Sequence, residues 1–299
     1  MPPLLEPLPI YRRSSESELA SRMGQMTQKP RSIVLDLFGD YLRYVSDGIR
    51  LKQITSLLGI FDVPPATVRV TMSRLRREGW FTTRTIGRES VYHLTPRMVE
   101  ILDEGRARIF AEPTMDWTGH WTMVIYQMTE SERQERDGLR KMLAWHGFGP
   151  LSTSTWLAPG DRRAEAREFV NALTSSHQVD VLLCSSESLH HDRELARRCW
   201  ALDQLEKDYQ TFIRSNRRLP RMVDRVTGAE AVIVRTRLIW EYRHFPFRDP
   251  RLPVELRPKP WHGIEAYALF RRAHAMLGEA ARTHVSVVIG GEIGPLPHV

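Results

Sequence analysis

The sequence predicts an α+β protein built from three parts, and three patterns carry that prediction. Three short amphipathic helical segments are followed by a β-rich hairpin between residues 30 and 94. Strand and helix patterns then alternate as βαββαβ between residues 121 and 184. From residue 193 the pattern is mainly helical. A chain of 299 residues, with 41% hydrophobic and 26% charged residues, can form two or three globular cores.

Residues 1–28 are rich in Pro, Ser, Glu and Gln and show no sustained period, so we expect a flexible tail there. Its prolines interrupt the apolar core that a signal peptide needs, and no run of 18 apolar residues predicts a membrane span. Two cysteines, Cys184 and Cys199, are too few for a disulfide framework or a tetrathiolate metal site. We therefore expect a cytoplasmic protein that binds no membrane.

The helices of the first part are bounded by proline and glycine. Pro30 opens an amphipathic helix over Arg31–Val45, and Gly48 lies just past its end. Leu51–Leu58 repeats the pattern before Gly59, and Pro64-Pro65 opens a third helix that runs to about Arg77.

Two β-rich runs follow, Trp80–Arg84 and Ser90–Leu94, and residues 85–89 join them with a glycine at the tip. Thr95-Pro96 then starts a fourth helix that ends near Phe110. Three helices and a hairpin form a winged helix-turn-helix, which we assign to residues 29–113.

The second part, residues 114–188, has the βαββαβ order of a ferredoxin-like domain. Its predicted elements are a strand at Trp121–Met128, a helix at Ser131–Trp145, two short strands within 147–158, a helix at Arg162–Leu173 and a strand at Val179–Cys184. The third part, residues 189–299, should be a mainly helical domain. Its predicted helices are Arg193–Asn216, Gly228–His244 and Gly263–Leu277, and weak alternation over Thr283–Ile289 suggests a terminal strand.

At 100° per residue, the third helix buries one narrow face that holds Val68, Met72 and Leu75. The opposite face presents small polar side chains and arginines, the groups that contact base edges and phosphates. We predict that the base-reading residues are Thr67, Val70, Ser73 and Arg74. The full set of predicted DNA contacts, with the wing included, is Thr67, Arg69, Val70, Ser73, Arg74, Arg77, Arg84 and Arg88.

Charge supports a polyanionic partner. The chain has 43 Lys and Arg against 36 Asp and Glu, and seven arginines but only two acids lie between Pro65 and Arg97. The competing interpretation is a solvated basic helix in a helical bundle. In addition, Arg69 and Arg76 border the buried face, where each is also a candidate to pair with an acid such as Asp36 or Asp40.

Together these residues resemble the PaaX-type transcriptional regulators, repressors of phenylacetate and related aromatic catabolism, over roughly 30–277. The resemblance is carried by 67–75 with Glu78-Gly79-Trp80, by Gly87-Arg88 and 92–95, and by Trp117 and the strand near Trp121. It is most specific in 237–243, 249–253 and Trp261-His262-Gly263. It implies a Cas2-like middle domain, a homodimer on palindromic double-stranded operator DNA, and release by an aromatic acyl-CoA such as phenylacetyl-CoA.

The third part has the residue types that a CoA thioester needs, namely cations for phosphates and aromatic groups for the acyl chain. The candidate effector residues are Arg237, Trp240, Tyr242, Arg243, His244 and Trp261. The alternative is that the apolar residues of this segment form a helix core while its arginines pair with Glu241, Asp249 and Glu255.

A Cas2-like fold also raises the alternative of a metal-dependent nuclease or a nucleic-acid structural protein with a winged-helix anchor. However, Tyr126-Gln127-Met128-Thr129 occupies the place where the family pattern has an Asp, and the nearest acid is Glu130. We interpret Leu189-His190-His191-Asp192 as a surface loop in which Asp192 caps the next helix, because two further spaced metal ligands are missing. With no glycine-rich phosphate loop, GxSxG or HExxH motif, we expect no catalytic residues, no metal and no cofactor.

Overall fold

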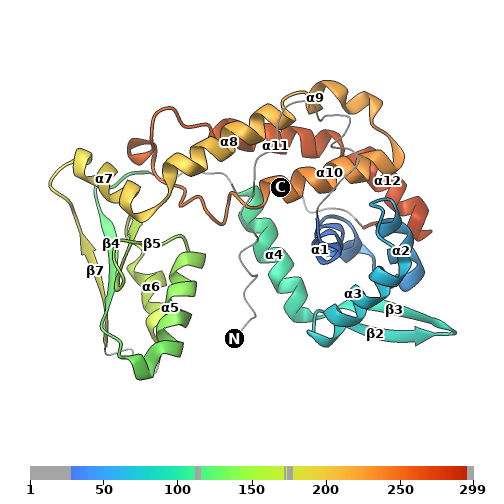
Figure 1. Cartoon of the computed structure of the whole chain (residues 1–299), viewed down its shortest axis with the longest axis horizontal. Helices are drawn as coiled ribbons and strands as arrows, with labels where there is room; N and C mark the ends of the chain where they lie inside the picture. The colour runs from blue at the N-terminus through green and yellow to red at the C-terminus, as the bar shows by residue number, and fades with distance from the viewer. Residues whose placement is uncertain (1–27, 112–115, 172, 174–177, 295–299) are drawn as a thin grey trace.

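The computed structural model describes residues 28–111, 116–171, 173 and 178–294 (Figure 1). The predicted tail lies outside the described residues except for Gln28. That residue is buried, and its side-chain amide donates a hydrogen bond of 2.6 Å to Asp36. The described residues therefore begin at the last residue of the predicted tail. Within the described residues, no helix combines the length and apolar character that crossing a membrane requires.

The N-terminal part is a winged helix-turn-helix, as predicted. Its elements are α1 (Pro30–Asp40), β1 (Ile49–Arg50), α2 (Leu51–Gly59), α3 (Pro65–Arg77), β2 (Phe81–Ile86) and β3 (Glu89–Leu94). Pro30 and Pro65 occupy the first helical positions, where a missing N–H costs nothing. Gly79 has a φ of 78°, which a residue with a side chain rarely adopts, and it ends the turn after α3.

The three-stranded sheet has the order β1-β3-β2, and the short strand β1 was not predicted. Ile86 pairs with Glu89, so only Gly87 and Arg88 form the turn at the tip of the wing. The predicted loop over 85–89 was therefore too long. The strands continue because a two-residue turn with a positive φ at glycine matches their twist.

The helix α4 (Pro96–Phe110) links the wing to the rest of the molecule, and the Thr95 side chain accepts a hydrogen bond from the Met98 amide at its start. In Figure 1 it runs between the N-terminal helices and the central sheet. This confirms the predicted fourth helix.

The central part has the predicted βαββαβ order. Its elements are β4 (Trp121–Tyr126), α5 (Arg133–Trp145), β5 (Gly149–Pro150), β6 (Thr155–Pro159), α6 (Arg163–Asn171) and β7 (Val179–Cys184). The strands form one antiparallel sheet in the order β5-β6-β4-β7. Val124 and Tyr126 face α5 and α6, whereas Trp121 packs in a separate cluster with residues of α7. Both faces of the sheet are therefore partly covered.

The C-terminal part is helical: α7 (Leu189–Cys199), α8 (Leu202–Asn216), α9 (Leu219–Met222), α10 (Gly228–Tyr242), α11 (Gly263–Met276) and α12 (Gly278–Ile289). The single helix predicted from Arg193 to Asn216 is wrong. The chain leaves the helical conformation at Trp200, whose ring stacks on Trp121 with centroids 6.3 Å apart. Packing of one tryptophan on the central sheet thus interrupts a helical pattern.

The loop predicted at Leu189–Asp192 is also wrong, because these residues form the first turn of α7. Ser188 caps this helix, and its side chain accepts a hydrogen bond from the His191 amide. Asp192 is buried and accepts a hydrogen bond of 2.7 Å from the Trp121 indole. The Asp192 carboxylate therefore accepts the hydrogen bond of a buried indole N–H and does not have the predicted helix-capping role.

The terminal strand expected over Thr283–Ile289 is instead the second half of α12. Ala281, Val285 and Ile289 lie four residues apart and are all buried. They belong to the same hydrophobic cluster as Ile33 of α1 and Leu57 of α2. The weak alternation suggested a strand, but the apolar stripe packs into the core of the winged helix-turn-helix as a helix.

Candidate nucleic-acid interface

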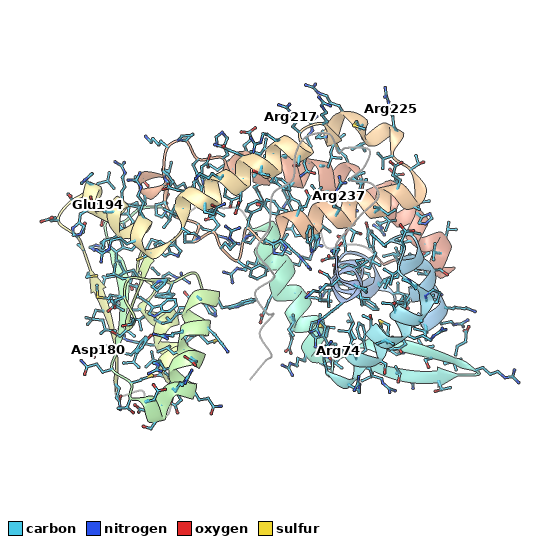
Figure 2. All side chains as sticks on the ribbon, viewed as in Figure 1. Arg74, Asp180, Glu194, Arg217, Arg225 and Arg237 are labelled. Carbon is cyan, nitrogen blue, oxygen red and sulfur yellow. The ribbon has the colours of Figure 1, made fainter. Side chains whose placement is uncertain are left out.

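The inner and outer faces of α3 differ as the sequence predicted. Val68, Met72 and Leu75 are at most 1% exposed, whereas Val70 on the outer face is 68% exposed. The predicted arginines Arg69, Arg74 and Arg77 are exposed, and Thr67 and Ser73 are half-buried. Figure 2 shows Arg74 on the outer side of the winged helix. This face presents the methyl groups of one valine, two hydroxyl groups and three guanidinium groups. Side chains of these kinds can contact base edges and phosphates in a major groove.

The wing extends this surface. Arg84 on β2 and Arg88 in the turn are both exposed, and Ile86 beside the tip is 55% exposed. In Figure 1 the hairpin projects away from the body of the molecule next to α3. The wing arginines thus lie where phosphates next to a groove-bound α3 would pass.

Glu78, just after α3, organises two of the surrounding arginines. It accepts a hydrogen bond of 3.0 Å from Arg74 Nε and also pairs with Arg31 of α1. The Arg31 guanidinium lies 4.3 Å from the ring centroid of Trp80, at the start of the wing. Arg74 therefore has a carboxylate partner in Glu78. The Arg74 side chain is nevertheless 70% exposed.

The alternative pairing of Arg69 or Arg76 with Asp36 or Asp40 is wrong. Arg69 is exposed, and the Arg76 guanidinium lies 3.5 Å from the Thr83 hydroxyl. The two aspartates of α1 are buried and pair with other arginines, Asp40 with Arg235 of α10 and Asp36 with Arg243 just after α10. Both border arginines thus remain on the solvent side of α3.

Asp40 ends α1 and lies in a buried network with α10 and α11. Its carboxylate is 2.9 Å from Arg235 Nε and 3.2 Å from His274 Nε2. Burial alone would raise the pKa of Asp40, but Arg235 and His274 outweigh it and hold the pKa well below its usual range. Asp36, one turn earlier, pairs with Arg243 at 2.5 Å. Contacts of Asp40 with Arg235 and of Asp36 with Arg243 therefore join the first helix of the winged helix-turn-helix to α10 and to the residue that follows it.

The six predicted effector residues do not surround one cavity. Tyr242 is in the hydrophobic core, stacked on Phe270 with centroids 4.1 Å apart, and Arg243 is held by Asp36 and Ser32. The remaining four make separate contacts: Arg237 with Glu241, Trp240 with His244, and Trp261 with Tyr209. Of the three acids suggested as arginine partners, Glu241 pairs with Arg237. Asp249 accepts a hydrogen bond from Tyr209, and the backbone carbonyl of Glu255 accepts one from Arg193.

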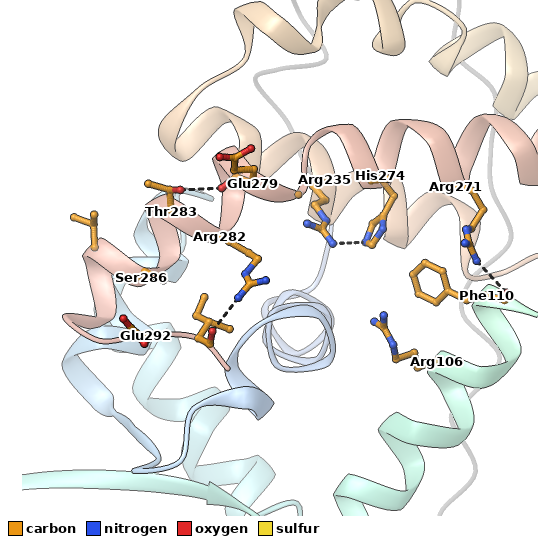
Figure 3. Close-up of a pocket in the computed structure, with 14 residues that line it drawn as sticks. Arg106, Phe110, Arg235, Arg271, His274, Glu279, Arg282, Thr283, Ser286 and Glu292 are labelled. Carbon is orange, nitrogen blue, oxygen red and sulfur yellow. Dashed lines mark hydrogen bonds between the residues drawn. The ribbon is translucent and has the colours of Figure 1, made fainter. Parts of the chain in front are cut away.

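A cavity that sequence reasoning missed lies between α4, α11 and α12, with a volume of about 850 Å³. Its charged lining residues are Arg106, Arg235, Arg271, His274, Glu279, Arg282 and Glu292 (Figure 3). No local motif marks it, because the residues come from four segments up to 186 positions apart. The one signal in the sequence is that the lining residues of α11 and α12 recur every three or four positions, which places them on one helix face.

The central domain gives no geometric support to a nuclease site. Glu130 is exposed and pairs with Arg133 and Arg136. Among the described residues, no group of three or more His, Cys, Asp or Glu side chains is placed to hold a metal ion. His190 and His191 each lie near a glutamate of their own helix region, Glu194 and Glu187 respectively.

Comparisons with known proteins agree along the chain. Three family models match successive regions: "PaaX-like protein" over residues 29–98, "PaaX protein central Cas2-like domain" over 114–196 and "PaaX-like protein C-terminal domain" over 200–287. Transcriptional repressor PaaX of Escherichia coli (strain K12) is 28% identical over 277 residues, which cover 89% of this chain and 86% of the relative.

Among solved structures, the uncharacterized protein Rv0674 from Mycobacterium tuberculosis matches with a TM-score of 0.55 and 20% identity. The match covers 87% of this chain and 98% of that one, and it supports the fold alone. With the winged helix, the Cas2-like sheet and the helical part all matched in order by models of one family, the chain belongs to the PaaX family.

Proposed function

We propose that this protein is a transcriptional repressor that binds operator DNA as a homodimer and is released by an aromatic acyl-CoA of the phenylacetyl-CoA type. The observation that carries the DNA-binding role is the outer face of α3, where polar and basic side chains are exposed over a buried apolar face. The repressor relative in Escherichia coli supports the direction of regulation.

In this proposal, α3 enters the major groove and the wing lies along the adjacent backbone. Thr67, Val70, Ser73 and Arg74 contact base edges, whereas Arg69, Arg77, Arg84 and Arg88 contact phosphates. Phosphate contacts supply affinity that falls with salt, and base contacts supply the difference between cognate and random sequences. Glu78 accepts a hydrogen bond of 3.0 Å from Arg74 Nε and so holds this side chain before DNA binds.

A homodimer follows from the small size of one recognition helix. A single winged helix contacts too few base pairs to select an operator from a genome, and a protein with two-fold symmetry matches a palindromic site. Release requires an effector that binds the DNA-free conformation more tightly than the DNA-bound one, because equal affinity for both would shift nothing.

The test is a fluorescence anisotropy titration of the protein against a labelled duplex from its own promoter and a random duplex of equal length. We expect cooperative dimeric binding to the promoter and weaker binding to the random sequence at moderate salt. Phenylacetyl-CoA should dissociate the promoter complex, whereas phenylacetate should not. Equal affinity for both duplexes would contradict the repressor role.

A cleavage assay with Mg²⁺ separates this function from the nuclease alternative. We expect single- and double-stranded DNA and RNA to remain intact after prolonged incubation with the protein. Cleavage that is abolished by a Glu130→Gln variant would instead assign chemistry to the central domain.

A further inference from the structure

The cavity between α4, α11 and α12 has the size of a small-molecule site, since such sites typically enclose ~300–1,000 Å³. Its volume is about 850 Å³, and it is bounded by α4 on one side and by α11 and α12 on the other. Figure 3 shows Arg106 and Phe110 rising from α4 toward Arg235 and His274 on the opposite wall. The cavity therefore lies where the linker helix of the wing meets the C-terminal helices.

The inner wall of this cavity is positively charged. Four arginines line it, and they are buried or half-buried: Arg106, Arg235, Arg271 and Arg282. The two acids, Glu279 and Glu292, are exposed at its rim. Because charges interact more strongly away from water, the less exposed arginines weigh more in the potential of the lining than the two exposed acids do.

One of these arginines has a donor that no described residue satisfies. Arg235 is 2% exposed, and its Nε and Nη2 atoms contact Asp40 and His274. Its Nη1 atom has no hydrogen-bond partner among the described residues. Nη1 is packed beside Gly278, where an added Cβ would come within 2.9 Å of it, and both residues belong to the cavity lining. A buried cationic donor without an acceptor is costly, which favours an anionic ligand at this point.

The cavity also offers apolar surface. Phe110, Ala275 and Ile293 line it, and Val287 at its edge is 73% exposed. A side chain of this kind on an exposed helix face gains from contact with an apolar group. The lining thus suits a ligand that combines an anionic group with an apolar one.

Arg235 connects this cavity to the DNA-binding part directly. The guanidinium of this lining residue also contacts the carboxylate of Asp40, the last residue of α1. An anion bound beside Arg235 would compete with Asp40 for its positive charge and so act on the contact between α10 and α1. A single side chain would thereby link occupancy of the cavity to the winged helix.

We propose that this cavity binds a phosphate-bearing anion with an apolar group, and that the arginines of the lining attract its anionic group. The assignment of the ligand as the acyl-CoA effector rests on the proposed function, whereas the anion site rests on the arginines. The six effector residues suggested by the sequence are then structural.

The test uses Ala275→Glu, which adds a negative charge at an exposed position of the lining and removes no packing atom. Ala275→Gln has the same size without the charge. Ala268→Glu places the same charge two turns earlier on α11, at an exposed position outside the lining. Calorimetry on the full chain measures binding of phenylacetyl-CoA, free CoA, pyrophosphate and phenylacetate.

We expect phenylacetyl-CoA to bind the wild type, Ala275→Gln and Ala268→Glu with affinities within about threefold of one another. Ala275→Glu should bind it at least about tenfold more weakly, equivalent to ~1.4 kcal/mol. Free CoA should show the same pattern. Equal binding by Ala275→Glu and the wild type would overturn the site, as would an equal loss in Ala275→Gln. Failure of all three phosphate compounds to bind the wild type would also overturn it.

The wild type and Ala275→Glu are also compared in the promoter titration, which tests the cavity site and the proposed effector response separately. If phenylacetyl-CoA releases DNA from Ala275→Glu as readily as from the wild type, the site is wrong and the effector response stands. If the wild type binds the ligand through an Ala275→Glu-sensitive site but keeps its DNA, the site stands and the proposed effector response is wrong.

Discussion

The arginines of α3 and those of α10 belong to similar sequence patterns but have opposite roles. Arg69, Arg74 and Arg77 are exposed on the face of α3 opposite its buried side. Arg235 is instead buried against Asp40 of α1, and Arg243, just after α10, is half-buried against Asp36. An arginine-rich helix therefore indicates a ligand surface only when its arginines have no carboxylate partners elsewhere in the fold. For Arg235 and Arg243 these partners lie about 200 residues away in sequence.

The largest expected effect comes from breaking the buried network. Arg235→Ala leaves the Asp40 carboxylate buried without its main partner, and removal of one member of such a pair typically costs ~3–5 kcal/mol of folding stability. Urea denaturation followed by circular dichroism measures the change. Arg77→Ala, on the exposed face of α3, is the matched control, and we expect its midpoint to stay at the wild-type value. Similar midpoints for both variants would contradict the contrast between the two helices.

The same network should make stability depend on pH. Burial lowers the pKa of His274 and outweighs Asp40, which raises it. His274 therefore takes up its proton at a higher pH in the unfolded chain than in the folded one, so its contribution to the free energy of unfolding should be lost as the pH drops below ~6.5. Asp40, whose pKa is held low, contributes stability above its ordinary value of about 4, which is lost as the pH falls further.

Thermal melts between pH 7.5 and 4.5 test this dependence. His274→Gln should flatten the profile between about pH 6.5 and 5, while His190→Gln on the exposed first turn of α7 should keep the wild-type shape. An unchanged slope in His274→Gln would show that other groups cause the acid sensitivity.

Arg74→Ala should reduce discrimination at one base pair by ~1–3 kcal/mol while leaving the fold intact, because the side chain is exposed and reaches a base edge in the proposal. Anisotropy titrations against the operator and its single-base variants measure this. Glu78→Gln, which removes the partner of Arg74, serves as control and should retain the base preference. A uniform loss on cognate and random DNA would move Arg74 to the phosphate contacts.

The smallest effect is expected at the tip of the wing. Arg88→Ala should weaken binding to all sequences alike and make the salt dependence shallower by about one in the log–log slope. Titrations at several salt concentrations give this slope. A change in base preference would show that the wing takes part in sequence recognition.

Local signals were sufficient to predict α3 and its exposed face. Pro65 and Gly79 mark its ends, and the spacing of Val68, Met72 and Leu75 sets its buried side. These signals depend only on residues within the helix and at its ends, so the position and the buried face of α3 can be predicted without knowledge of tertiary contacts.

The remaining features depended on distant partners. Trp200 breaks a helical pattern because Trp121 is there to stack on, and Thr283–Ile289 is helical because α1 and α2 present an apolar groove to α12. The cavity combines Arg106 with Arg235 and Arg282, which no local pattern relates. Tertiary contact overrides propensity in each case.

The packing of α12 against α2 has a consequence for how the protein is made. The hydrophobic cluster of the winged helix contains residues from Ile33 to Ile293, and the Gly294 amide donates to the Tyr44 carbonyl at 3.0 Å. During synthesis the first domain to emerge therefore lacks part of its own core until α12 has been translated. Such long-range closure slows folding and leaves apolar surface open in truncated products. A chain that ends before α12 would therefore be expected to lack a complete winged-helix core.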